Sequence, residues 1–117
     1  MANVLSYAMN NPFLRAVLST ESYTTTAPLG NESSGFYYNL YCIWASRYSG
    51  NKSKNGTIFA AKTGYTPEAG QCLASVSVTD DGKEYVIVTV GAKSVNNDDA
   101  KPKPYKDAKY LLDTYIK

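Results

Sequence analysis

The sequence predicts an α+β fold in which a three-stranded antiparallel sheet is flanked by N-terminal and C-terminal helices. Two observations indicate this class: residues 71–90 carry a β-hairpin pattern, and apolar residues recur at helical spacing near both ends of the chain. Strands joined by a tight turn pair antiparallel, and helices before and after such a sheet are typical of α+β proteins. With 117 residues the chain suits one small core, so we expect residues 1–117 to form a single domain.

The hairpin is the clearest element. Residues 84–90 read EYVIVTV, which is rich in β-branched residues, and Asp81 with Gly82 forms a dipeptide typical of tight turns. A third strand is predicted over residues 57–63, followed by a turn region over residues 64–70. Residues 71–79 alternate, so their side chains fall on two faces. One face holds Leu73, Ser75, Ser77 and Thr79, and the other holds Cys72, Ala74, Val76 and Val78.

Helical spacing predicts three helices. The first covers residues 2–10, and a short second helix begins after Pro12, because proline suits a first helical turn. An amphipathic pattern over residues 105–116 predicts a closing helix. Its expected buried face consists of Ala108, Leu111, Leu112, Tyr115 and Ile116.

The middle of the chain is less regular. β-Branched and aromatic residues predict a short strand over residues 22–26, and a loop is predicted over residues 27–35. Residues 36–48 are apolar and compatible with helix or strand, and their length favours a helix. Polar stretches predict loops over residues 49–56 and 95–104.

Charge and composition exclude several classes of function. The formal net charge is +2, with 12 basic and 10 acidic residues, which is too balanced to indicate a nucleic-acid-binding protein, so no nucleic-acid partner is expected. Lys101, Lys103 and Lys106 are separated by prolines and are interpreted as part of a solvated loop. The chain has no histidine, which excludes Ser-His-Asp and Cys-His catalysis and argues against zinc. We therefore expect no metal and no cofactor.

The cysteines and the N-terminus bear on the cellular compartment. Cys42 and Cys72 are too few for a disulfide framework; two free thiols are favoured, and a single bridge stays open. No apolar run approaches the roughly 18 residues that a membrane-spanning helix needs. The N-terminus has no basic region followed by an apolar block, so no signal peptide is expected in this chain.

The chemical signal is the triplet of Lys62, Thr63 and Gly64. A lone Lys-Thr-Gly recurs by chance and then marks only a strand end, but residues 62–75 read KTGYTPEAGQCLAS directly before the hairpin. This stretch resembles the third motif of the penicillin-binding proteins, in particular the low-molecular-mass serine-type D-Ala-D-Ala carboxypeptidases. Further matching positions are Thr66, Ala69, Gly70, Leu73, Ala74 and Ser75.

The resemblance extends in both directions. Upstream, MANVLSYAMNNPFLRAVLSTESYT resembles the helix that precedes this strand in the family, and downstream YKDAKYLLDTYIK resembles its closing helix. Residues 27–56 match poorly. The resemblance implies that the chain is the C-terminal portion of a catalytic domain with the transpeptidase fold of β-lactamases and penicillin-binding proteins.

The resemblance also implies residue roles, with the substrate peptide held as an extra strand beside the motif. Lys62, the catalytic residue of the set, would supply positive charge near the reacting centre, and Thr63 would offer its hydroxyl to the substrate carboxylate. Gly64 lets the substrate backbone come close, and the Tyr65 N–H would be one of two oxyanion-hole donors. Thr66 completes the predicted substrate-binding set.

The nucleophile of the family is missing from this chain. It belongs to a Ser-x-x-Lys motif that, like the Ser-x-Asn motif, lies N-terminal to the Lys-Thr-Gly strand. The chain does contain matches, at Ser49 with Lys52 and at Ser53 with Asn55. Both lie back to back in a polar loop where no helix aligns Ser49 with Lys52, so we interpret them as chance matches. The chain is expected to be inactive alone.

A second departure concerns the substrate carboxylate. Many members of the family place an arginine just before the last helix, and this chain has Pro104 at that position. Lys103 or Lys106 is a candidate substitute. A lysine is a point charge, however, and is not equivalent to a bidentate arginine.

The resemblance implies an exported parent enzyme that acts on peptidoglycan stem peptides outside the cytoplasmic membrane and binds β-lactams. We interpret this chain as a fragment of it, since Met1 falls where the family often has an internal methionine. In the family's five-stranded sheet, N-terminal strands pair with the strand at residues 84–90, so that edge is expected to be unpaired. We therefore expect self-association, through this edge or by exchange of an N-terminal helix.

Two other functions stay open on the sequence alone. One is a non-catalytic module that keeps the strand and uses it to bind peptides. The other is an unrelated α+β domain with a chance Lys-Thr-Gly. Covalent labelling by a fluorescent penicillin separates the enzyme from both.

Overall fold

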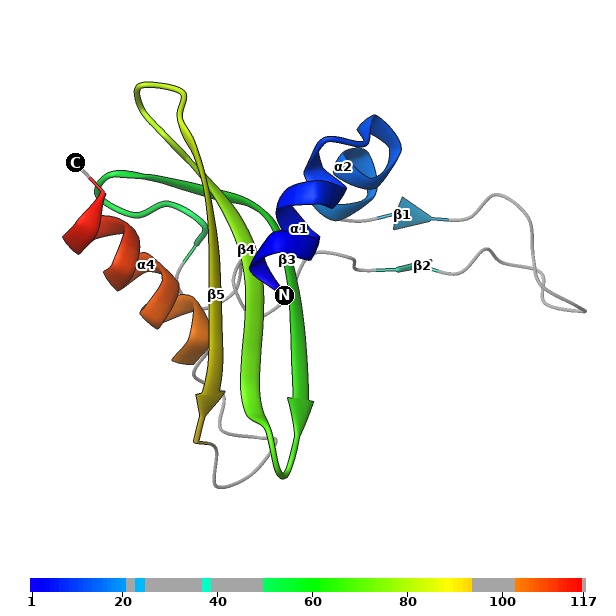
Figure 1. The fold of residues 1–117 in the computed structure, drawn as a ribbon, viewed down its shortest axis with the longest axis vertical. Helices are drawn as coiled ribbons and strands as arrows, with labels where there is room; N and C mark the ends of the chain where they lie inside the picture. The colour runs from blue at the N-terminus through cyan, green and yellow to red at the C-terminus, as the bar shows by residue number, and fades with distance from the viewer. Residues whose placement is uncertain (21–22, 25–36, 39–49, 94–102, 117) are drawn as a thin grey trace, which may run out of the picture.

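Figure 1 shows a computed structural model of the chain, which describes residues 1–20, 23–24, 37–38, 50–93 and 103–116. Two short helices come first, then two short strands, three long strands and a final helix. Their bounds are α1 Ala2–Met9, α2 Pro12–Ser19, β1 Tyr23–Thr24, β2 Tyr37–Tyr38, β3 Gly56–Thr66, β4 Gly70–Thr79, β5 Glu84–Ala92 and α4 Lys103–Tyr115.

The three long strands form one antiparallel sheet in the order β3-β4-β5. The predicted turn joins β4 to β5, and the Gly82 N–H donates to the Thr79 carbonyl at 2.9 Å. A separate two-stranded sheet pairs β1 with β2. Helices precede and follow the three-stranded sheet, so the predicted α+β class is confirmed.

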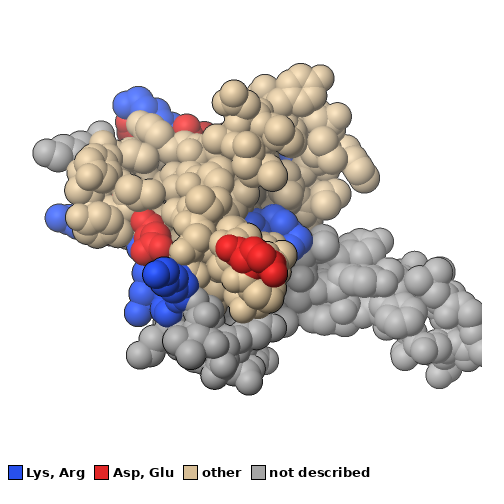
Figure 2. All heavy atoms as spheres, turned by 60° about the horizontal axis from the view of Figure 1, so that its bottom comes forward, with Lys and Arg blue, Asp and Glu red and all other residues tan. Residues whose placement is uncertain are grey.

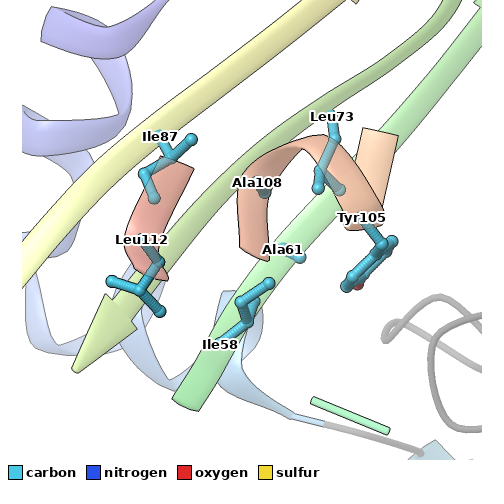
Figure 3. Packing of buried hydrophobic residues seen from close by; sticks show 7 residues of the cluster. All are labelled: Ile58, Ala61, Leu73, Ile87, Tyr105, Ala108 and Leu112. Atoms are coloured by element: carbon cyan, nitrogen blue, oxygen red, sulfur yellow. The ribbon is translucent and has the colours of Figure 1, made fainter. Parts of the chain in front are cut away.

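Helices cover both faces of the long sheet. On one face α4 packs against all three strands, and Figure 3 shows Leu112 and Ala108 directed at the strand side chains. This cluster consists of Ile58, Ala61, Leu73, Ile87, Tyr105, Ala108 and Leu112. On the other face α1 packs in a second cluster of Leu5, Met9, Ala60 and Val76. Burying each large apolar side chain stabilises the layers by roughly 1.5–3 kcal/mol.

The serine-bearing face of β4 is buried rather than solvated. Ser75 and Ser77 are both 0% exposed and lie on the same side of the strand as Leu73, beneath α4. The Ser75 hydroxyl donates to the Ile87 carbonyl at 3.1 Å, which satisfies a polar group that would be costly to bury alone. The small serine side chains leave room for the helix that covers this face.

The second helix begins as the sequence predicts. The Asn11 side chain accepts hydrogen bonds from the Phe13 and Leu14 N–H groups at 3.0 and 3.2 Å, and Pro12 occupies the first turn. This cap satisfies two of the N–H groups that a helix start leaves without an intrahelical partner.

Arg15 links α2 to the sheet. Its Nη1 donates to Glu84 Oε2 at 3.0 Å, and its guanidinium lies 5.2 Å from the ring centroid of Phe59. The hydrogen bond between the two side chains raises the pKa of Arg15 and lowers the pKa of Glu84. Because Glu84 begins β5 and Phe59 belongs to β3, Arg15 joins the helix to both edge strands.

Two predictions in the middle of the chain are wrong. Tyr37–Tyr38 is a strand and not a helix, because it pairs with Tyr23–Thr24, and pairing outweighs a length-based preference for helix. β3 runs to Thr66 rather than ending at Thr63, since its ladder with β4 continues to the pair of Thr66 and Gly70. The turn is therefore shorter than predicted.

The closing helix also differs from its prediction. α4 begins at Lys103 and not at Tyr105, because Pro104 fits a first helical turn. Tyr115, assigned to the buried face, is 73% exposed, whereas Tyr105 is 1% exposed and packs in the core. Leu111 and the following Ile116 are partly buried against the cluster.

Some predictions lie outside the described residues: the loop over 27–35, the rest of 36–48 and the state of Cys42. Cys72 is a free thiol opposite Gly64 in the β3–β4 ladder. In the described part of the chain β5 is an edge of its sheet, and self-association through residues 84–90 stays a prediction.

Leu112→Ala is expected to lower the free energy of unfolding by about 2–5 kcal/mol, because Leu112 is fully buried between α4 and the sheet. The matched control is Tyr115→Ala on the same helix, which is expected to change it by no more than about 0.5 kcal/mol. Urea unfolding followed by circular dichroism measures both. Equal losses would contradict the assignment of the buried helix face.

Candidate functional site

A bulge in β3 sets the direction of the Lys-Thr-Gly motif. The ladder with β4 shifts register between Ile58 and Ala60, which makes Phe59 an extra residue. Ile58 and Ala61 pack in the α4 cluster, whereas Phe59 and Ala60 both pack with the α1 cluster. Lys62, the next residue along, therefore projects from the face that α1 covers.

The same bulge decides which backbone groups of β3 face away from β4. The Ile58 N–H donates outside the sheet, to the Asn51 carbonyl at 3.0 Å. Successive residues of a strand direct their N–H and C=O groups to opposite sides, and the extra residue Phe59 shifts this alternation by one position. The N–H and C=O groups of Thr63 and Tyr65 therefore face the sheet edge and not β4. The Thr63 carbonyl, one of these edge-facing groups, accepts a hydrogen bond from the Lys62 ammonium at 2.6 Å.

The five predicted site residues lie in consecutive positions at the end of β3. Lys62, Gly64 and Thr66 are exposed, Tyr65 is 40% exposed, and Thr63 is half-buried. A Cβ placed on Gly64 would meet no atom within 4 Å, so packing does not demand glycine there. Thr66 has a structural task, because its hydroxyl accepts a hydrogen bond from a turn N–H, that of Ala69, at 3.0 Å.

A pocket of about 400 Å³ adjoins this edge where β3 turns into β4. It is lined by Tyr65, Pro67, Glu68, Ala69, Gly70, Gly91 and Lys93. Sequence reasoning missed Glu68 and Lys93, because a single charge in a turn and another after a strand form no pattern. The pairing of β4 with β5 brings these two residues to one pocket.

The serine-containing loop lies at the other end of β3. Ser53 and Asn55 come just before Gly56, and roughly 20 Å of strand, at about 3.3 Å per residue, separate Gly56 from Lys62. The Ser53 hydroxyl donates to the Gly56 carbonyl at 3.2 Å, within its own loop. Ser53 is therefore not part of the site around Lys62, as the sequence interpretation expected.

Asn55 fastens that loop to the end of α4. Its side-chain amide donates to the carbonyls of Asp113 and Ile116 at 3.2 and 2.7 Å, and its N–H donates to Asp113 Oδ1 at 3.0 Å. Burial raises the pKa of Asp113, but hydrogen bonds from Asn55, Ser53 and Lys54 outweigh it, so the pKa is lowered. These hydrogen bonds between Asn55 and the end of α4, called the latch below, give the loop a structural role.

Pro104, which stands where the family is expected to have an arginine, and the neighbouring Lys103 make contacts within the fold. Pro104 is buried at the start of α4, and its carbonyl accepts a hydrogen bond from the Thr89 hydroxyl at 3.4 Å. The Lys103 ammonium donates to the Lys93 carbonyl at 2.6 Å, whereas Lys106 is exposed on the helix. Of the basic residues near this end of the sheet, Lys93 is the one that lines the pocket.

The chemical groups that this edge offers are an ammonium at Lys62, a hydroxyl at Thr63 and edge-facing backbone groups. Within the described ranges, no cluster of three or more His, Cys, Asp or Glu side chains is placed to hold a metal ion. None of the helices described is both long and apolar enough to cross a membrane.

Comparison with known proteins bears on the fold. No family model and no curated protein matches the sequence. The crystal structure of a D-alanyl-D-alanine carboxypeptidase from Mycobacterium tuberculosis H37Rv matches with a TM-score of 0.65 and 18% sequence identity. The match covers 94% of this chain and 36% of that chain, so this chain spans about a third of its length. The likeness shows a shared fold.

Removing the latch tests its structural role. Asn55→Ala is expected to lower the free energy of unfolding at neutral pH by about 1–3 kcal/mol, because it leaves carbonyls at the end of α4 without their donor. Urea unfolding measures the loss. An unchanged stability would mean that the loop is not fastened to α4.

Asp113→Asn tests the pH dependence of the same latch. A carboxyl whose pKa is lowered by folding stabilises the protein above its ordinary value of 3.8, and this contribution is lost as pH falls. The variant is therefore expected to lose less stability than the wild type between neutral pH and pH values below 3.8. Asp107→Asn, exposed on the same helix, is the control and is expected to follow the wild type.

Proposed function

We propose that this chain is the substrate-binding C-terminal portion of a serine-type D-Ala-D-Ala carboxypeptidase, and that residues 1–117 belong to its catalytic domain. The observation that carries the proposal is the accessible edge of β3, with Lys62, Thr63, Gly64 and Tyr65 in consecutive positions. A fold shared with a D-alanyl-D-alanine carboxypeptidase supports it. In this proposal the whole enzyme acts outside the cytoplasmic membrane on peptidoglycan stem peptides and binds β-lactams.

The proposed substrate binds as an additional strand beside β3. Edge-facing N–H and C=O groups of Thr63 and Tyr65 pair with the peptide backbone, which gives affinity without reading side chains. Gly64 leaves the space that the peptide needs, which accounts for a glycine that packing does not require. The Tyr65 N–H donates to the carbonyl oxygen that gains charge during acyl transfer.

Binding of a peptide also changes the partner of Lys62. In the free protein its ammonium donates to the Thr63 carbonyl, which is one of the edge acceptors that a paired strand uses. An incoming peptide N–H competes for that carbonyl. The ammonium is then free to turn toward the bound peptide, where its charge stabilises developing negative charge.

The serine nucleophile of this proposal lies outside the 117 residues. The serine of the Ser-x-Asn match, Ser53, is bonded within its own loop at the opposite end of β3. The role proposed for this chain is therefore to hold the substrate, and it is inactive alone. Acyl transfer requires the polypeptide that carries the Ser-x-x-Lys motif.

A second candidate is a non-catalytic peptide-binding module. The same edge supports it, because strand addition needs only backbone groups and an unobstructed approach. The two candidates predict the same binding by this chain. They differ in whether a longer polypeptide from the same locus reacts covalently with a penicillin.

Gly64→Val is expected to weaken binding of a peptide that ends in D-Ala-D-Ala by about tenfold or more, because the new side chain occupies the approach of the peptide. The fold is expected to tolerate it, since a Cβ meets no atom there and valine suits a strand. Titration followed by amide NMR shifts at Tyr65 measures affinity, and urea unfolding checks stability. Unchanged affinity would contradict binding at this edge.

A fluorescent penicillin is expected to leave the 117-residue chain unlabelled, because no serine among the described residues lies one helical turn from a lysine and the match at Ser49 is interpreted as a chance one. Denaturing gel electrophoresis with fluorescence detection measures covalent labelling. Labelling of a longer polypeptide from the same locus supports the carboxypeptidase over the binding module. Labelling of the chain itself would show that it holds a working nucleophile.

A further inference from the structure

The second helix, α2, is short and has no buried side chain. It contains eight residues, and Leu18 is only partly buried against the α1 cluster. A helix of this length is marginal in water by itself, because most helical stability in proteins comes from packing an apolar face. The ion pair of Arg15 and Glu84 is exposed, and exposed ion pairs contribute little. We therefore expect an apolar cover over α2.

The first two helices expose apolar side chains that form what we call the α1–α2 face. Val4 and Tyr7 are three residues apart on α1, and Phe13 and Val17 are four apart on α2, so each pair shares one side of its helix. Leu14 completes the face. Tyr7 is 81% exposed and Phe13 is 73% exposed.

The α1–α2 face carries almost no charge. Arg15 is the only charged side chain among residues 1–20, and its guanidinium is bonded to Glu84. Figure 2 shows the surface over these helices, at the upper right, as almost free of charged side chains. In a twofold dimer the same surface meets itself, so a charged face would bring like charges together. An uncharged face has no such repulsion and suits a second copy of the chain.

The size of the face also fits a second copy. An aromatic side chain offers roughly 150–250 Å², and we estimate that the five side chains expose on the order of 600 Å². Two copies would bury about 1,200 Å² in total, which is the lower end of the range for specific, stable interfaces. Soluble monomers rarely expose apolar patches larger than a few hundred Å².

We propose that the α1–α2 face is a docking surface for a second copy of this chain, related to the first by a twofold axis. Tyr7 and Phe13 are the residues on which binding depends most, because large aromatic side chains dominate the energetics of interfaces. The second copy supplies the apolar cover that α2 lacks. This interface differs from the edge of β5 and from helix exchange, and it does not depend on the proposed function.

Sedimentation equilibrium of the 117-residue protein measures the association. The wild type is expected to approach twice the monomer mass as its concentration rises, with a dissociation constant in the micromolar range. Phe13→Lys and Tyr7→Lys are each expected to raise that constant about tenfold or more. The matched controls are Tyr110→Lys and Tyr115→Lys on α4, which are also exposed and are expected to leave it unchanged.

A second measurement needs no variant. In a mixture of isotope-labelled and unlabelled wild-type protein, filtered NMR spectra are expected to show contacts between the rings of Tyr7 and Phe13 in one copy and the helices α1 and α2 of the other. Amide exchange in α2 is expected to slow as the concentration rises, because the interface covers the helix. Circular dichroism checks that each lysine variant folds.

Three outcomes would overturn the proposal. One is a wild type that stays monomeric at millimolar concentration, which would leave the face to another segment of a longer polypeptide. Another is association that survives in Phe13→Lys and Tyr7→Lys without contacts between copies at these rings, which would favour the edge of β5. The third is an equal loss of association in the α4 controls, because added charge and not this face would then govern association.

Discussion

The insertion of Phe59 into β3 is the constraint on which the site depends. Before the bulge, the Ile58 N–H points away from β4 and donates to the Asn51 carbonyl. After the bulge, the alternation of side chains between the two faces is shifted by one residue, and Ala61 packs in the α4 cluster. If residues 58–62 alternated regularly, without the bulge at Phe59, Lys62 would share the face of Ile58 and project beneath α4, where burying an ammonium without a partner is costly. One bulge therefore lets a strand that is packed along its first half present an accessible motif along its second.

The hydrogen bonds that fasten α4 and the proposed binding edge lie at opposite ends of the sheet. At one end Asn55 fastens the loop before β3 to the last turn of α4 through Asp113. At the other end lie the exposed motif and the pocket that Gly70, Gly91 and Lys93 help to line. The Lys93 carbonyl there accepts a hydrogen bond from the Lys103 ammonium at the start of α4. Because α4 spans both ends, it supports the edge from behind without covering it.

The hairpin, the capped second helix and the closing helix could be predicted because turn residues, a proline and apolar spacing act locally. Tyr37–Tyr38 was predicted as helix because an apolar run carries no information about a distant pairing partner. The prediction that Tyr115 is buried, where the structure buries Tyr105, is wrong for a similar reason. Apolar spacing defines a face only to within a residue or two, and contact with the sheet decides which tyrosine is buried.

The sequence by itself determined the order of the two N-terminal helices, the three long strands and the closing helix. It also determined the Lys-Thr-Gly motif and the turn that follows it, since each of these features depends on neighbouring residues. Only the tertiary structure decided that helices cover both faces of β4, that Lys62 lies on the α1 face, and that Glu68 and Lys93 line one pocket. The physical reason is that these features depend on strand register. A shift of register by one residue moves every side chain of a strand to the other face, and register is settled by packing between elements distant in sequence.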